Sequence, residues 1–167
     1  RLHGRSRAPR ARREPAAGQL PGEGGQEPHL ALVAHPTVRF VAHAPGLLEV
    51  RRELHRHPEL SGQEKQTQAF VLKTLEGLGI ETATYPGQHA VVGLLRGTFP
   101  GKTVALRADM DALPILETSL LPFASVHPGV MHACGHDAHM AIALGAARLL
   151  SEHKHRLRGQ VKLLFEP

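Results

Sequence analysis

Apolar residues recur at helical spacing in three stretches of the chain. The first stretch starts at Pro45 and stops before His57-Pro58, where the proline disfavours further helix; its apolar face consists of Leu47, Leu48, Val50 and Leu54. The second follows residues 61–64 (SGQE), which are typical of a capping box, and ends at Gly77 and Gly79; its apolar face consists of Phe70, Val71, Leu75 and Leu78. The third, residues 138–150, is rich in small and apolar side chains and predicts a mostly buried helix.

Four other stretches are typical of strands: residues 80–85, 90–96, 103–108 and 160–165. The second and third are separated by turn-forming residues 97–101. Residues 109–135 predict a loop too long to be a passive connector, and such loops are usually functional. Helices that alternate with strands predict an α/β fold, with a sheet covered by helices on both faces.

The composition differs sharply between the N-terminal segment and the rest. Residues 1–29 contain six arginines and three glutamates, several glycines and prolines, and almost no apolar side chains. Such a segment cannot bury enough surface to offset its ordering entropy, so we expect residues 1–44 to be disordered and a folded domain to span residues 45–167. The segment lacks the interleaved aromatics and folded basic surface of a nucleic-acid-binding arm, which argues against a nucleic-acid partner.

The chain has no feature of a membrane or secreted protein. Its longest apolar run, residues 140–147, is far shorter than the ~20 residues that a bilayer span needs. No apolar signal region follows the N-terminal arginines, and the single cysteine excludes an intramolecular disulfide framework. We therefore expect a cytoplasmic protein without a membrane partner.

Thirteen histidines in 167 residues point to metal or proton chemistry, and the densest cluster lies in residues 131–139 (MHACGHDAH). Thiolate and imidazole are the ligands that zinc and similar ions prefer, which makes Cys134 and His136 candidate ligands. Their i, i+2 spacing lets both side chains point to one side of an extended segment. Asp137 is placed to hold a metal-bound imidazole, and His139 lies one helical turn further on.

Two further polar clusters are candidates. Asp109 and Asp111 follow the strand at 103–108, where ligands collect in open α/β sheets, with Arg107 as a charge partner. They can ligate a metal, orient a ligand or hold a proton. The segment 55–59 (HRHPE) favours a helix exit with a turn fixed by proline over a metal site.

Three segments, in this order, resemble a known family: residues 51–61 (RRELHRHPELS), 105–115 (ALRADMDALPI) and 129–141 (GVMHACGHDAHMA). They are similar to the metal-dependent aminoacylase/carboxypeptidase family of metallohydrolases. Within it they look most like the amidohydrolase branch, which contains hippurate hydrolase and N-acetyldiaminopimelate deacetylase. The resemblance runs from about Pro45 to the end of the chain and implies a zinc-exopeptidase-like catalytic domain.

The resemblance implies a hydrolase that cleaves the amide of N-acyl amino acids, or of related small amides, by metal-activated water. It implies that Cys134 and His136 are metal ligands and that Asp109 or Asp111 is a catalytic aspartate that orients a ligand. It further implies two divalent ions per subunit (zinc, manganese or cobalt), a small N-acyl amino acid as substrate, and a homodimer as one assembly open to the full-length family member.

The family pattern continues with Phe-Gln-Pro and then Ala-Glu-Glu, whereas this chain reads Phe165-Glu166-Pro167. We therefore expect the general-base glutamate, the later ligands and the lid and dimerisation domain to lie outside these residues, and the chain alone to be inactive. Leu120, where glycine is common, is a second departure. Two other functions stay open: a non-catalytic metal-binding or interaction module, and a cysteine hydrolase that uses Cys134 with a histidine base.

Overall fold

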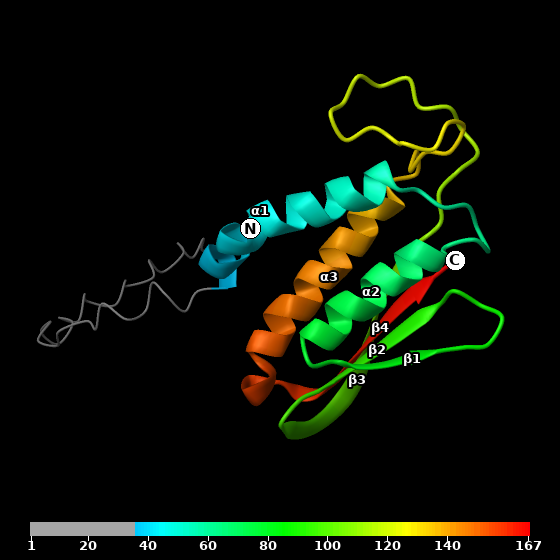
Figure 1. The fold of residues 1–167 in the computed structure, drawn as a ribbon. Helices are drawn as coiled ribbons and strands as arrows, with labels where there is room; N and C mark the ends of the chain where they lie inside the picture. Colours follow the sequence, from blue (N-terminus) through cyan, green and yellow to red (C-terminus); the bar gives the residue numbers. More distant parts are fainter. Residues whose placement is uncertain (1–35) are drawn as a thin grey trace, which may run out of the picture.

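The computed structural model describes the backbone of residues 36–167 and the side chains from residue 46 onward. It contains, in chain order, α1 (Pro36–Arg56), α2 (Lys65–Gly77), β1 (Glu81–Thr84), β2 (Val91–Arg96), β3 (Phe99–Asp109), α3 (His136–Glu152), a short 3₁₀ helix η2 (Lys154–Arg156) and β4 (Arg158–Glu166) (Figure 1). All predicted helices and strands are present, and residues 110–135 form the long loop that the sequence predicts.

Several element boundaries differ from the predictions. α1 begins at Pro36 rather than Pro45. Proline suits the first turn of a helix, where its missing N–H has no partner in any case. Residues 36–44, which we expected to be disordered, are thus part of α1. Residues 1–35 lie outside the described part of the chain, so their disorder and the boundary between a disordered segment and a folded domain stay predictions. β3 starts at Phe99, inside the expected turn, because Phe99 pairs with Arg158 before an irregularity that ends at Thr103.

The predicted capping box at residues 61–64 is wrong. The residue that caps α2 is Glu64, and its side chain makes no capping hydrogen bond. The N–H groups of Gln66 and Thr67 instead donate to the carboxylate of Glu59, at 3.1 and 2.8 Å. The cap therefore comes from the segment that leaves α1, which a local four-residue pattern does not reveal.

The four strands form one mixed sheet in the order β1-β2-β4-β3. β1 and β4 are each antiparallel to β2, whereas β3 and β4 are parallel and are connected through α3. This parallel pair places the carboxyl ends of both strands at one edge of the sheet, where Asp109 pairs in register with Glu166. The end of β3 and the start of α3 are thus brought to the same edge.

The core lies between one face of the sheet and the helices. Val161, Leu163 and Phe165 of β4 alternate with more exposed residues and pack with residues of α2 and α3 in one apolar cluster. α1 packs across α3 at Gly145, where a Cβ would come within 2.7 Å of Leu47 Cδ2, so glycine permits the close approach of these helices. α3 buries one side only, since Ile142 on its other side is 67% exposed.

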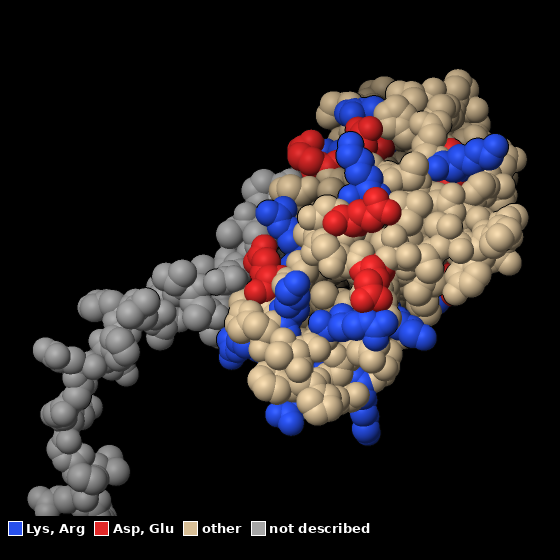
Figure 2. All heavy atoms as spheres, turned by 60° about the horizontal axis from the view of Figure 1, so that its bottom comes forward, with Lys and Arg blue, Asp and Glu red and all other residues tan. Residues whose placement is uncertain are grey.

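The sequence predicts helices on both faces of the sheet, whereas the described helices cover one face. The opposite face of the sheet carries Val92, Leu94 and Leu164, which are neither buried nor fully exposed, next to charged residues such as Lys162. The α/β fold is confirmed, and within residues 36–167 the helices lie on one face of the sheet. Figure 2 shows that basic and acidic side chains lie next to each other over the face of the molecule in view.

Candidate metal centre

Three side chains with metal-binding groups meet at the edge of the sheet where β3 ends. Asp109 is the last residue of β3, and His136 and His139 lie in the first turn of α3. One ligand atom from each lies within 4.8 Å of the other two. The two histidines are three residues apart on a helix, so they share a face, and their rings stack at 5.6 Å between centroids.

Asp111 fixes the orientation of the His136 ring. Its carboxylate Oδ1 lies 2.8 Å, and its backbone carbonyl oxygen 2.9 Å, from Nδ1 of His136. With two acceptors at this nitrogen, Nδ1 carries the proton and donates, which leaves the lone pair on Nε2. A carboxylate on the far nitrogen of a ligating histidine is the usual arrangement in metal sites. Of the two predicted aspartates, Asp111 therefore orients a histidine and Asp109 joins the group of ligand atoms.

The predicted charge partner Arg107 does contact Asp109. Its guanidinium lies 2.7 Å from Asp109 Oδ1 and 2.7 Å from Glu166 Oε2. The hydrogen bond to Glu166, followed by the charges of Asp109 and Glu166, raises the pKa of Arg107 above its ordinary value. The arginine thus balances two carboxylates at the carboxyl ends of β3 and β4.

Cys134 does not belong to this group. It is exposed, and it lies in a turn just before Gly135, whose φ of 81° places it in the left-handed region. The extended backbone that we assumed for Cys134 and His136 is absent, because His136 already belongs to α3. Within residues 46–167, Cys134 makes no hydrogen bond to a histidine, as a cysteine nucleophile with a histidine base requires.

Asp137 has a different partner from the one predicted. We expected it to hold a metal-bound imidazole, whereas its Oδ2 accepts from Arg51 Nε at 2.7 Å and lies 2.8 Å from Nδ1 of His55. The reason is its position on α3, since Asp137 faces α1 and is fully buried there, while its neighbour His136 faces the end of β3.

His55, which contacts Asp137, also contacts the long loop. His55 Nε2 lies 3.2 Å from Glu117 Oε1, and this carboxylate also accepts from the Ser119 hydroxyl and the Ser125 N–H. Burial acts to raise the pKa of Glu117, but the hydrogen bonds from Ser119, Ser125 and His55 outweigh it and lower the pKa. Glu117, which the sequence did not single out, thus ties the loop to α1 through His55, and Ser125 holds the Glu117 carboxylate from within the loop.

His132 lies in this region without a hydrogen-bond partner. It is 3% exposed, and neither ring nitrogen has a partner among the described residues. Burial is the main cause that lowers the pKa of His132 to about 4, and electrostatic interaction with the neighbouring His55 and His136 adds to it against the opposing effect of the Asp137 carboxylate. His132 is therefore neutral near pH 7.

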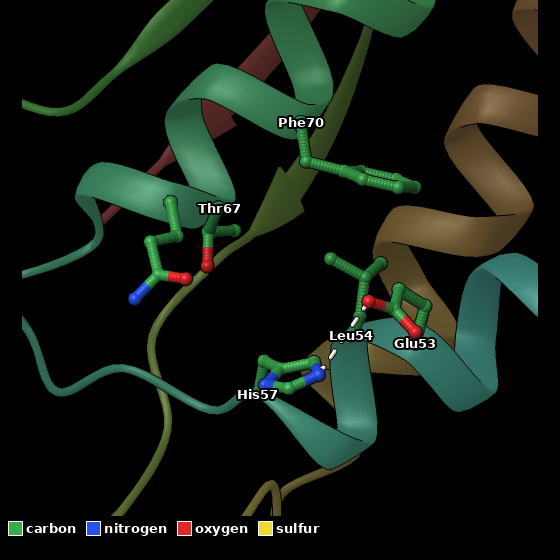
Figure 3. Close-up of a pocket in the computed structure, with 6 residues that line it drawn as sticks. Glu53, Leu54, His57, Thr67 and Phe70 are labelled. Atoms are coloured by element: carbon green, nitrogen blue, oxygen red, sulfur yellow. Dashed lines mark ion pairs between the residues drawn. The ribbon is translucent and has the colours of Figure 1, made fainter.

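In the other predicted cluster, residues 55–59, His57 and Glu59 have structural roles. His57 pairs with Glu53 at 3.5 Å, and Glu59 caps α2. His57, Glu53 and Leu54 face Thr67 and Phe70 of α2 across a cavity of about 180 Å³ (Figure 3). None of the residues that line this cavity belongs to the group of Asp109, His136 and His139.

Comparison with known proteins gives the family to which part of this chain corresponds. Residues 105–167 match the model of peptidase family M20/M25/M40, and they include Asp109, His136 and His139. The chain contains part of a peptidase M20 family domain. It is 50% identical over 116 residues to an N-acyl-L-amino acid amidohydrolase of Geobacillus stearothermophilus, a match that covers 70% of this chain and 31% of the relative. It is 52% identical over 122 residues to thermostable carboxypeptidase 2 of Saccharolobus solfataricus, covering 72% of this chain and 31% of the relative.

The fold agrees with a solved structure of the same family. A dinuclear metal-binding peptidase of the M20 family from Bacillus subtilis superposes with a TM-score of 0.72 and 44% sequence identity, over 76% of this chain and 36% of the other. The chain thus spans about a third of the length of the relatives that it matches. Among the described residues, no helix has the length and apolar character needed to cross a membrane.

Proposed function

We propose that the protein is a metal-dependent amidohydrolase that hydrolyses N-acyl amino acids or related small amides, and that this chain supplies part of its divalent-metal site. The single observation that carries the proposal is the convergence of Asp109, His136 and His139 within 4.8 Å, with Asp111 on the far nitrogen of His136. The relative named as an N-acyl-L-amino acid amidohydrolase supports the substrate class.

The donor set fits a divalent ion. One carboxylate and two imidazoles suit zinc, manganese or cobalt, and Asp111 fixes the tautomer that leaves Nε2 of His136 free to bind. Cys134 remains a proposed ligand from the resemblance, since its thiol is exposed in the turn that precedes His136. A second ion would need ligands in addition to Asp109, Cys134, His136 and His139.

The residues of the chain have distinct tasks in this proposal. Asp109, His136 and His139 bind, Asp111 orients His136, and Arg107 balances the negative charge of Asp109 and Glu166. When bound, the metal polarises the scissile carbonyl and lowers the pKa of water, so that attack proceeds near neutral pH. A general base that takes the proton from water is a further requirement of the reaction.

Metal binding tests the site directly. We expect the purified chain to retain zinc or cobalt after dialysis, the His136→Ala variant to lose it, and Cys134→Ala to reduce it. His155→Ala is the matched control and should bind as the unsubstituted chain does, because His155 is exposed and lies in η2, beyond the end of α3 opposite to His136. Equal metal content in the chain and in His136→Ala would contradict the assignment.

The reaction is tested with a panel of N-acyl amino acids, assayed on the whole protein that contains this chain. We expect turnover to stop with a chelator and to return with zinc, manganese or cobalt. Activity that persists in excess chelator but stops with a thiol alkylator would favour the cysteine hydrolase. Metal retention without turnover on any amide would favour a non-catalytic metal-binding module.

A further inference from the structure

Two carboxylates in the structure hold the first turn of α3 from different sides. Asp111 contacts His136 from the end of β3, and Asp137, the next residue along, is held from α1. We infer that Arg51, His55, Glu117 and Asp137, here called the Asp137 network, are positioning residues that set where His136 and His139 lie relative to Asp109. This inference rests on the proposed metal site.

The Asp137 network joins three segments that are far apart in the sequence. Asp137 Oδ2 is shared by Arg51 Nε and His55 Nδ1 of α1, at 2.7 and 2.8 Å. His55 Nε2 reaches Glu117 of the long loop at 3.2 Å. Since the side chains of His55 and Glu117 are 3% and 4% exposed and that of Asp137 is fully buried, the contacts of His55 with the two carboxylates are shielded from water.

The start of α3 has little other local restraint. Gly135 caps the helix without a side-chain hydrogen bond. A helix that begins without a side-chain cap frays more readily, because its first N–H groups lack partners. The side-chain hydrogen bonds that hold the first turn, which carries both histidines of the candidate centre, are thus those of Asp111 on one side and of Asp137 on the other, next to the buried Met140.

The buried charge of Asp137 also requires its pairing with Arg51. A fully buried carboxylate without a counter-charge is strongly unfavourable, and Oδ1 of Asp137 has no hydrogen-bond partner among the described residues. The Arg51 guanidinium is the cation in contact with it, and the Arg51 side chain is 34% exposed. Loss of the Arg51 charge therefore favours movement of Asp137, and with it of the first turn of α3, toward water.

The chain offers a matched pair of arginines for the test. The guanidinium groups of Arg51 and Arg52 both lie over the ring of Phe123, at 5.2 and 5.5 Å from its centroid. Arg51 contacts Asp137, whereas Arg52 pairs with the exposed Glu49 on its own helix. Arg51→Gln and Arg52→Gln thus remove the same charge and the same ring contact, and they differ in the contact with Asp137.

Two measurements on the full chain follow the position of His136. Cobalt titration, monitored by visible absorption, reports the affinity and geometry of the site. Long-range ¹H–¹⁵N spectra of the metal-free chain report the tautomer of His136, with His136→Ala to assign its signals. We expect Arg51→Gln to weaken cobalt binding about tenfold and to mix the His136 tautomers, and Arg52→Gln to change neither.

Equal cobalt affinity and a single His136 tautomer in both glutamine variants would overturn the inference. If the unsubstituted chain binds no cobalt, the proposed metal site fails, while the tautomer comparison still decides the role of the Asp137 network. If circular dichroism shows that Arg51→Gln unfolds, Arg51→Lys takes its place. It keeps the charge but not the planar Nε donor, and it should weaken cobalt binding by an intermediate amount if the network positions His136. Unchanged binding in a folded Arg51→Lys together with an unchanged tautomer would count against the inference.

Discussion

His55, His132 and His136 carry the same imidazole, but their surroundings give them different roles. His136 donates to Asp111 and keeps Nε2 for a ligand, whereas His55 lies between the buried carboxylates of Asp137 and Glu117. His132 is buried with no partner for either nitrogen among the described residues. The chemistry of each histidine is thus set by the groups around it and not by its position in the motif.

The depressed pKa of His132 makes stability depend on pH. Its pKa is about 4 in the folded chain and about 6.5 when unfolded, so the unfolded chain binds the extra proton between these values. The stabilisation is fully present above pH 6.5 and is lost as the pH falls to 4. We expect urea unfolding in the presence of a chelator to show a loss on the order of 3 kcal/mol from this residue over that range.

The variant His132→Gln tests this assignment, because glutamine does not titrate. It should make the decline of the unfolding free energy between pH 6.5 and 4 shallower, whereas His155→Gln, at an exposed position, should leave the slope unchanged. An unchanged slope in His132→Gln would show that other groups cause the acid sensitivity.

Among the secondary-structure elements, α2 is capped by a residue from outside the helix. Glu59 accepts hydrogen bonds from the N–H groups of Gln66 and Thr67 and from the Thr67 hydroxyl. Its own carbonyl accepts from the N–H of Ala112, next to the bridge between Leu60 and Ala112. The segment after α1 therefore ties α2 to the loop that leaves β3 and carries Asp111.

We expect Glu59→Gln to destabilise the fold. An amide can accept through one oxygen only and lacks the negative charge that a helix N-terminus favours, so the loss should be about 1–2 kcal/mol. Urea unfolding followed by circular dichroism measures it. Glu81→Gln, whose carboxylate pairs with Arg96 on the exposed side of β1 and β2, is the control and should cost less. Equal losses in the two variants would contradict the capping role of Glu59.

For the molecule as a whole, the candidate centre lies where a strand end and a helix start meet. β3 supplies Asp109, the loop supplies Asp111, and α3 supplies His136 and His139. A ligand that binds all of these at once binds the folded chain and not the unfolded one. Metal binding should therefore be linked to global stability.

We expect zinc to raise the melting temperature of the chain, and a chelator to reverse the increase. At a free zinc concentration 100 times the Kd, the stabilisation is about 2.7 kcal/mol. Differential scanning calorimetry measures it, with His136→Ala as the variant that should not respond. A shift of the same size in His136→Ala would place the zinc at other residues.

Much of the fold follows from local patterns. Period-two and helical spacing of apolar residues locate the strands and α2 and α3 to within a few residues, because each element must bury one face. The cap of α2 and the start of α1 were missed, since the first depends on a contact between separate segments and the second precedes the apolar pattern. The spacing of apolar residues shows that a helix has a buried face, but it does not show which face of the sheet the helix covers. That choice depends on how the elements pack.

The sequence by itself determined which side chains carry metal-binding groups at the end of a strand and at the start of a helix, in motifs 25 residues apart, as Asp111 and His136 are. It predicted Cys134 and His136 as the ligands, whereas the ligand atoms that lie together are those of Asp109, His136 and His139. The i, i+3 spacing of His136 and His139 was also visible. Only the tertiary structure decided which of these side chains lie together: the parallel pairing of β3 with β4 brings Asp109 to α3, Asp111 contacts the imidazole of His136, and Asp137 contacts Arg51 and His55 of α1. The physical reason is that a ligand set is a matter of a few ångströms between atoms of different elements, and the packing of the elements sets those distances.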